Sequence, residues 1–72
     1  MSEVCAAVRL PNRNRNAVLE RVANRCGVAH DGFTVSKNKC EFFHYYIGQN
    51  HAVEAFVREA LQGGFDAKMR LG

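Results

Sequence analysis

The sequence lacks the long apolar runs and the cysteine framework that would assign it to a membrane or to a secreted class. No stretch approaches the ~18 consecutive apolar residues of a membrane span, and Glu3 interrupts an N-terminus that is only briefly apolar, which argues against a signal peptide. Its three cysteines, Cys5, Cys26 and Cys40, are an odd number at irregular spacing, so they predict no disulfide framework. We therefore expect free thiols, a reducing cytoplasm and no membrane partner.

Catalytic motifs are also missing. The chain has no nucleophile elbow, phosphate-binding loop, Gly-rich dinucleotide loop or paired-carboxylate pattern, so the sequence predicts neither an enzyme nor a cofactor. Cys5 and His44 could face each other across neighbouring strands as a thiol–imidazole pair, but no third residue is placed to orient them.

A zinc site is the other chemistry to consider. Cys26 and His30, and again Cys40 and His44, have the Cys-x3-His spacing of zinc ligands. However, residues four apart on an extended strand are separated by about 13 Å, which is too far to share one ion. Cys26 also belongs to an apolar helical stripe, where a free thiol is an ordinary core residue. We predict no metal site.

The composition is that of an ordinary globular chain. The 72 residues predict one small domain, 1–72, with 47% hydrophobic and 24% charged residues. A chain of this size has little room for a deep cavity, so we expect the functional part to be an interaction surface. The net charge of +3 permits contact with phosphates or an acidic protein, but a dedicated duplex-DNA binder is usually more basic.

Hydrophobic periodicity predicts a strand at 4–10 and a helix at 14–26. Alternation marks the strand, and Pro11 ends it. Asn14 or Asn16 is expected to cap the helix, and Gly27 suits a left-handed residue at its end. The core-facing stripe of this helix is Leu19, Val22, Ala23 and Cys26.

The second half of the chain repeats this alternation of element types. We expect strands at 33–37, 40–47 and 65–71, a loop from Val28 to Gly32 and a turn at Lys37-Asn38-Lys39. A second helix is expected at 50–62, capped by Asn50. Its predicted apolar stripe is Val53, Phe56, Val57, Ala60 and Leu61.

Two apolar helix stripes and a four-stranded antiparallel sheet fit together when both helices cover one face of the sheet. The order β-α-β-β-α-β, with right-handed crossovers, then predicts an α+β fold of the ferredoxin-like (split βαβ) type, with the first and third strands in the middle. This fold hosts many unrelated functions, so it predicts none.

The face of the sheet opposite the helices is the candidate interaction surface. Alternation places Arg9, Lys68 and Arg70 there, together with two rings of the strand 40–47. Those rings are Phe43 and Tyr45, or Phe42 and Tyr46 if the other side is exposed. Aromatics and arginine are enriched at interface cores, which favours a protein partner or a homodimer. Ordinary cross-strand packing is the alternative explanation for these rings.

Nucleic acid is a further possible partner, because aromatics on a basic sheet can stack unpaired bases. The element order and the segment from Lys39 to Tyr46 resemble the RNA-recognition-motif family. Lys39, Phe43 and Tyr45 fall on positions of its third-strand signature, which implies binding of single-stranded RNA. The chain departs from that signature at Cys40, where the family has Gly, and at Glu41, where it has the first stacking aromatic. The first strand also lacks the family's other aromatic.

Together these features lead us to expect a non-catalytic regulator that occupies a macromolecular partner, as an inhibitor or an adaptor. Small inhibitors encoded by phages and mobile elements, anti-CRISPR proteins among them, have this size and act by steric occlusion. That origin is an expectation from chain length alone.

Overall fold

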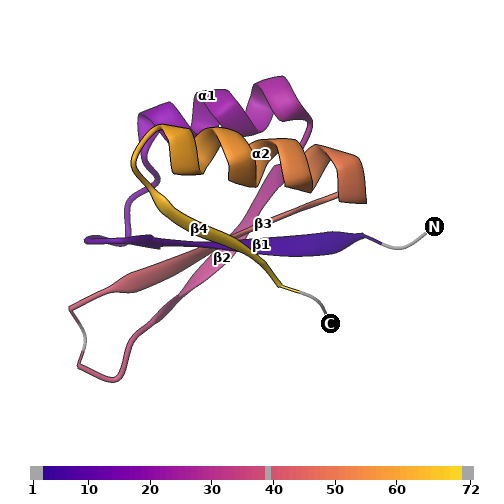
Figure 1. Cartoon of the computed structure of the whole chain (residues 1–72). Helices are drawn as coiled ribbons and strands as arrows, with labels where there is room; N and C mark the ends of the chain where they lie inside the picture. The colour runs from indigo at the N-terminus through magenta and orange to yellow at the C-terminus, as the bar shows by residue number, and fades with distance from the viewer. Residues whose placement is uncertain (1–2, 39, 71–72) are drawn as a thin grey trace.

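The computed structural model describes residues 3–38 and 40–70. Strands and helices follow one another in the order β1, α1, β2, β3, α2, β4 (Figure 1). Their bounds are β1 Val4–Leu10, α1 Ala17–Cys26, β2 Ala29–Val35, β3 Phe42–Gly48, α2 Asn50–Gln62 and β4 Asp66–Arg70. Lys39 and Leu71, which the sequence assigned to a turn and a strand, lie outside the described residues.

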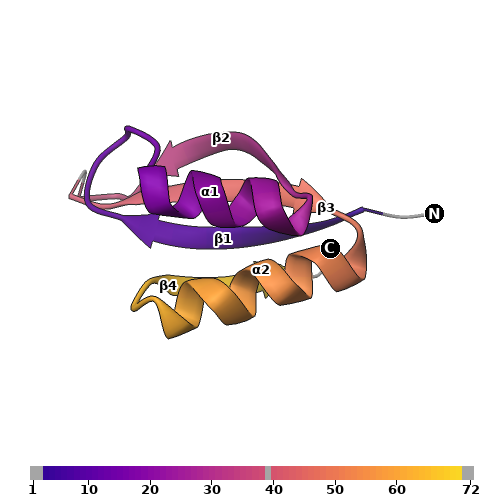
Figure 2. The ribbon, with the colours of Figure 1, turned by 90° about the horizontal axis from the view of Figure 1, so that it is seen from above.

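The strands form one four-stranded antiparallel sheet in the order β2-β3-β1-β4. The central pair, β1 and β3, is the pair expected from the sequence. Both helices lie over the same face of this sheet, α1 beside α2, and leave the other face open (Figures 1 and 2). The architecture is α+β and is compatible with the ferredoxin-like class.

The core lies between the helices and the sheet. Both strands of the central pair turn their fully buried side chains toward the helices, and both helices turn theirs toward the sheet. The largest fully buried side chains are Tyr46, Phe56, Leu19, His44, Val8 and Val53. Burial of a Leu or Phe side chain contributes about 1.5–3 kcal/mol, so Leu19 and Phe56 each stabilise the domain by about that amount.

Local signals define the ends of α1. Asn16 is the N-cap, and its side-chain oxygen accepts hydrogen bonds from the backbone N–H groups of Val18 (2.9 Å) and Leu19 (3.2 Å). Gly27 ends the helix in the left-handed conformation at φ 86°, which favours glycine. The helix therefore begins three residues after the start of the predicted range. Of the two candidate caps, Asn16 is the one that caps it.

The prediction for β2 was wrong at both ends. The strand begins at Ala29, inside the stretch expected to be a loop, and ends at Val35. A β-bulge between His30 and Phe33, with Gly32 at φ 96°, allows pairing with β3 to continue as far as Ile47. The bulge breaks the alternation of side chains, and so it hides the strand from a periodicity analysis.

Smaller corrections concern β3 and α2. β3 begins at Phe42 rather than residue 40. Asn50 is the first residue of α2 rather than its cap, because Gln49 holds the cap position without a side-chain hydrogen bond. Leu61 was expected in the core but is 53% exposed. Ala52, on the other border of the apolar stripe of α2, lies in the core instead.

Within the described residues, neither helix has the length and apolar character needed to cross a bilayer.

Candidate functional site

The candidate site is the open face of the sheet, and the orientation of β3 decides which rings it carries. His44 and Tyr46 point toward the helices and are fully buried. Phe43, Tyr45 and Ile47 therefore lie on the open face, each half-buried. Of the two orientations left open by the sequence, the structure has the one that exposes Phe43 and Tyr45.

Antiparallel register arranges the open face in rows that run across the strands. One row places Phe43 beside Arg9, and Arg9 beside Asp66. The next row contains Tyr45, Ala7 and Lys68 in that order. A third row contains Ala29, Ile47, Cys5 and Arg70. All five residues that the sequence assigned to an interaction surface, Arg9, Phe43, Tyr45, Lys68 and Arg70, thus lie on the open face.

Arg9 is held between two carboxylates. Its guanidinium lies 2.7 Å from Asp66 and 3.3 Å from Glu41. The side chains are each about half exposed, so these ion pairs contribute little to stability, within about 0–1 kcal/mol. Their effect is to fix the direction of Arg9 and to offset much of the positive charge of the open face. Glu41 belongs to the strand predicted at 40–47, but its pairing with Arg9 depends on the register between β1 and β3, which alternation along a single strand does not give.

Tyr45 is the best-anchored ring on the open face. The guanidinium carbon of Arg70 lies 5.2 Å from the centre of the ring, within the range of a cation–π contact. The Tyr45 hydroxyl is 2.8 Å from the Thr34 hydroxyl on β2. These two contacts restrain the ring, and a restrained side chain loses less entropy on binding.

A shallow depression lies beside these rings. It has a volume of about 240 Å³ and is lined by Ala7, Arg9, Phe43, Asp66 and Lys68. It exists because Ala7, the small residue of a central strand, lies between larger side chains of β3 and β4. The floor is apolar and the wall toward β4 carries both signs of charge, so the depression can accept an apolar side chain next to a polar one.

The proposed thiol–imidazole pair is ruled out by the register. Cys5 pairs with Ile47 on the open face, whereas His44 pairs with Val8 and points into the core on the other side of the sheet. Burial also raises the pKa of the Cys5 thiol, an effect that Arg70 opposes only in part. Cys5 therefore stays a protonated thiol near neutral pH, which is a poor nucleophile.

The four residues with zinc-ligand spacing do not converge. The Cys26 sulfur lies 3.7 Å from a Glu59 carboxylate oxygen, and burial together with that carboxylate raises the pKa of the thiol. His30 and His44 contact each other, while Cys40 is exposed in the connection between β2 and β3. In residues 3–38 and 40–70, no group of three or more His, Cys, Asp or Glu side chains is placed to hold an ion.

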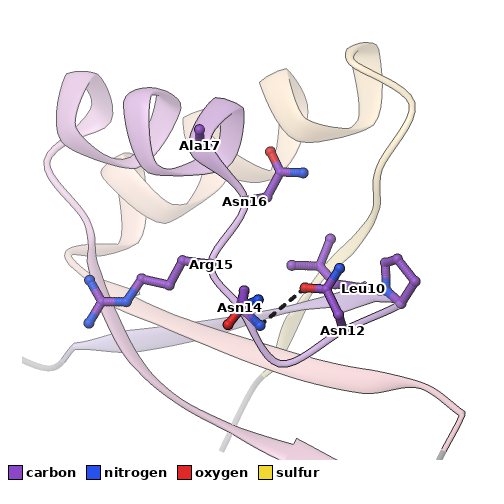
Figure 3. Close-up of a pocket in the computed structure, with 7 residues that line it drawn as sticks. Leu10, Asn12, Asn14, Arg15, Asn16 and Ala17 are labelled. Atoms are coloured by element: carbon purple, nitrogen blue, oxygen red, sulfur yellow. Dashed lines mark hydrogen bonds between the residues drawn. The ribbon is translucent and has the colours of Figure 1, made fainter.

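A second hollow, of about 250 Å³, lies at the loop between β1 and α1 (Figure 3). The side chains of Asn12, Arg15 and Asn16 in this hollow already have partners within the chain. The Asn12 side chain accepts a hydrogen bond from the Asn14 backbone, as the dashed line in Figure 3 shows. Asn16 caps α1, and Arg15 pairs with Glu20. The open face is therefore the stronger candidate.

The resemblance to the RNA-recognition motif can be compared with this geometry. Phe43 and Tyr45 lie on the open face, where the resemblance requires them, while Lys39 lies outside the described residues. Cys5 and Ala7 occupy the open side of β1, so that strand offers no ring for a base to stack on. The protein has no match among known protein-family models, curated proteins or solved structures.

Proposed function

We propose that this chain is a small, non-catalytic binding protein of the ferredoxin-like (split βαβ) class that recognises a partner protein through the open face of its sheet. The observation that carries the proposal is the depression around Ala7, with the Phe43 ring on one wall and a clamped Arg9 next to it. Ordered aromatic and arginine side chains around an apolar hollow are typical of interface hot spots. This surface fits a regulator of the inhibitor or adaptor type that is active in a reducing cytoplasm. We propose that a phage or mobile element encodes it, in the manner of anti-CRISPR proteins.

Charge supports a protein partner over nucleic acid. Glu41 and Asp66 lie among the cations of the open face and pair with Arg9, and a carboxylate repels a phosphate backbone. The Arg70 guanidinium also lies over the Tyr45 ring, on which a base would have to stack. A single-stranded RNA or DNA partner is the second proposal, since Phe43 and Tyr45 lie together on the open face.

The decisive experiment is capture of partners from the native host with the double variant Phe43→Ala with Tyr45→Ala. The proposal expects the wild-type chain to retain a specific protein and the variant to lose it, while circular dichroism shows an unchanged fold. The matched control is Val18→Ala with Leu61→Ala, which removes apolar side chains that are each 53% exposed on the helices. Retention of the same partner by the open-face variant would show that the rings are only sheet packing.

Nuclease treatment of the lysate separates the two proposals. Capture that survives nuclease supports a protein partner. Capture that is lost with nuclease, falls steeply with salt and disappears in Lys68→Glu with Arg70→Glu would instead support nucleic acid, because neutralised phosphates release counterions. A second copy bound at the open face would appear as self-association by light scattering that the Phe43/Tyr45 variant abolishes.

A further inference from the structure

The charges of the open face are not distributed evenly. At one end of the face, Arg9 pairs with both Glu41 and Asp66, so these two carboxylates are already engaged. At the other end, Lys68 and Arg70 of β4 are exposed, and neither has an ion-pair partner among the residues that the structure describes. The charge that this face can still neutralise on binding is therefore positive.

Both of these cations lie where the proposed partner would bind. The Arg70 guanidinium lies over the Tyr45 ring, at 5.2 Å from its centre. Tyr45 is on β3 and Arg70 on β4, so the arginine side chain crosses β1, whose open side carries the small residues Cys5 and Ala7. Lys68 lines the depression around Ala7. A partner that covers the ring and fills the depression therefore covers both cations.

A covered cation needs an anion. It loses its water when a partner lies on it, and that loss is offset only by an opposite charge with good hydrogen-bond geometry. Within the chain, Glu41 and Asp66 could supply that charge only by releasing Arg9. Asp31 is exposed, but it lies on β2 at the opposite edge of the sheet from β4. The compensating anions must therefore come from the partner.

We propose, on the basis of the proposed function, that the open face binds an acidic segment of its partner protein. An apolar side chain of that segment fills the depression around Ala7, and neighbouring Asp or Glu carboxylates pair with Lys68 and Arg70. The guanidinium can bind a carboxylate through two parallel hydrogen bonds. The two cations are two residues apart on one strand, about 7 Å, so acidic residues at alternate positions of an extended segment match their spacing.

Two other occupants fit this face less well. A second copy of the chain has a net charge of +3 and is not an acidic partner. A nucleic acid carries a phosphate at every residue, so part of its backbone would lie against Glu41 and Asp66. A protein segment can place an uncharged residue at that end and carboxylates at the other.

The first test is selection of peptides from a random library displayed on phage. The wild-type chain should select peptides in which Asp or Glu flanks an apolar residue, and the variant Lys68→Glu with Arg70→Glu should select basic peptides instead. Peptides that no longer bind Phe43→Ala with Tyr45→Ala are assigned to the open face. The matched control is Arg21→Glu with Arg58→Glu, which makes the same change in net charge at exposed positions of the two helices. It should select the same acidic peptides as the wild-type chain.

The second test measures the affinity of one selected acidic peptide by fluorescence anisotropy. Lys68→Met and Arg70→Met should each weaken binding roughly tenfold, and replacement of the acidic residues of the peptide by Asn or Gln should do the same. Once the cation has been removed, loss of the carboxylate that pairs with it should have little further effect. Such a double-mutant cycle isolates the interaction between the two groups.

The outcomes separate this inference from the proposed function. Open-face peptides without enrichment in Asp and Glu, or acidic peptides that bind the charge-reversed variant equally well, would overturn the inference and leave the proposed function standing. A selection in which no peptide depends on Phe43 and Tyr45 would contradict both. Self-association that the charge-reversed variant abolishes, or binding of mixed single-stranded oligonucleotides with which the acidic peptide does not compete, would assign the face to another occupant and also overturn the inference.

Discussion

His44 is a buried polar side chain whose ring nitrogens are both hydrogen-bonded. Its Nε2 lies 3.1 Å from the Asn12 carbonyl, and its Nδ1 lies 2.9 Å from Nε2 of His30. His30 Nδ1 accepts from the Gly32 backbone N–H at 3.2 Å. Because Gly32 can only donate and Asn12 can only accept, the chain of bonds has one direction, in which both rings are neutral. An extra proton on His30 would place its Nδ1–H against the Gly32 N–H, one donor against another.

Acid should therefore destabilise the fold through this pair. Burial, with Arg15 and His44 adding to it, lowers the pKa of His30 below its usual 6.5, and Glu20 and Asp31 oppose this in part. Well above pH 6.5 the His30 ring is neutral in both the folded and the unfolded chain, so it adds no pH dependence to the free energy of unfolding. As the pH falls below 6.5 the unfolded chain binds a proton that the folded chain resists, so stability decreases by up to about 1.4 kcal/mol per pH unit for one histidine.

Urea unfolding between pH 7.5 and 5.5 measures this effect. We expect the unfolding midpoint to fall over that range in the wild-type chain and in His51→Gln, whose histidine is exposed on α2. His30→Gln should reduce the dependence on pH. An equal decrease in His30→Gln would assign the acid sensitivity to other groups.

At the scale of elements, α1 is defined by its cap, and two asparagines of the same loop provide a matched comparison. Asn16 accepts from two backbone N–H groups of the first turn, whereas the Asn14 side chain is exposed outside the helix. Asn16→Ala should lower the free energy of unfolding by about 1 kcal/mol, because it leaves helix donors without a protein partner. Asn14→Ala should stay within about 0.5 kcal/mol of the wild type. Thermal or urea unfolding of the two variants checks the difference, and equal losses would contradict it.

At the scale of the whole molecule, the thiols and imidazoles of the described residues do not gather into one metal site. Cys5 lies on the open face, Cys26 packs against Glu59 of α2, and Cys40 lies in the connection between β2 and β3. We predict that the purified protein contains no stoichiometric zinc and that a chelator leaves its melting temperature unchanged. Elemental analysis that finds one zinc per chain, lost in Cys40→Ser, would show that the Cys-x3-His spacing has a function after all.

Much of the arrangement follows from local patterns. Strict alternation in β1 and β4 is enough to assign Arg9, Lys68 and Arg70 to one face of the sheet. Helical spacing of Leu19 and Ala23 identifies the core side of α1, and asparagine and glycine mark its ends. These signals are local, because the period of a strand or helix and the geometry of a cap depend only on neighbouring residues.

Tertiary structure decided the rest. β3 has aromatics on both sides, so its alternation could not choose a face; the choice came from partners distant in sequence. On the buried side, His44 reaches His30 and the Asn12 carbonyl, and the Tyr46 hydroxyl donates to Glu20 of α1 at 2.9 Å. A buried polar group without a partner costs several kcal/mol, so the side that finds partners is the side that packs inward. The early start of β2 has the same origin, since its bulged residues form a strand only because β3 lies alongside them.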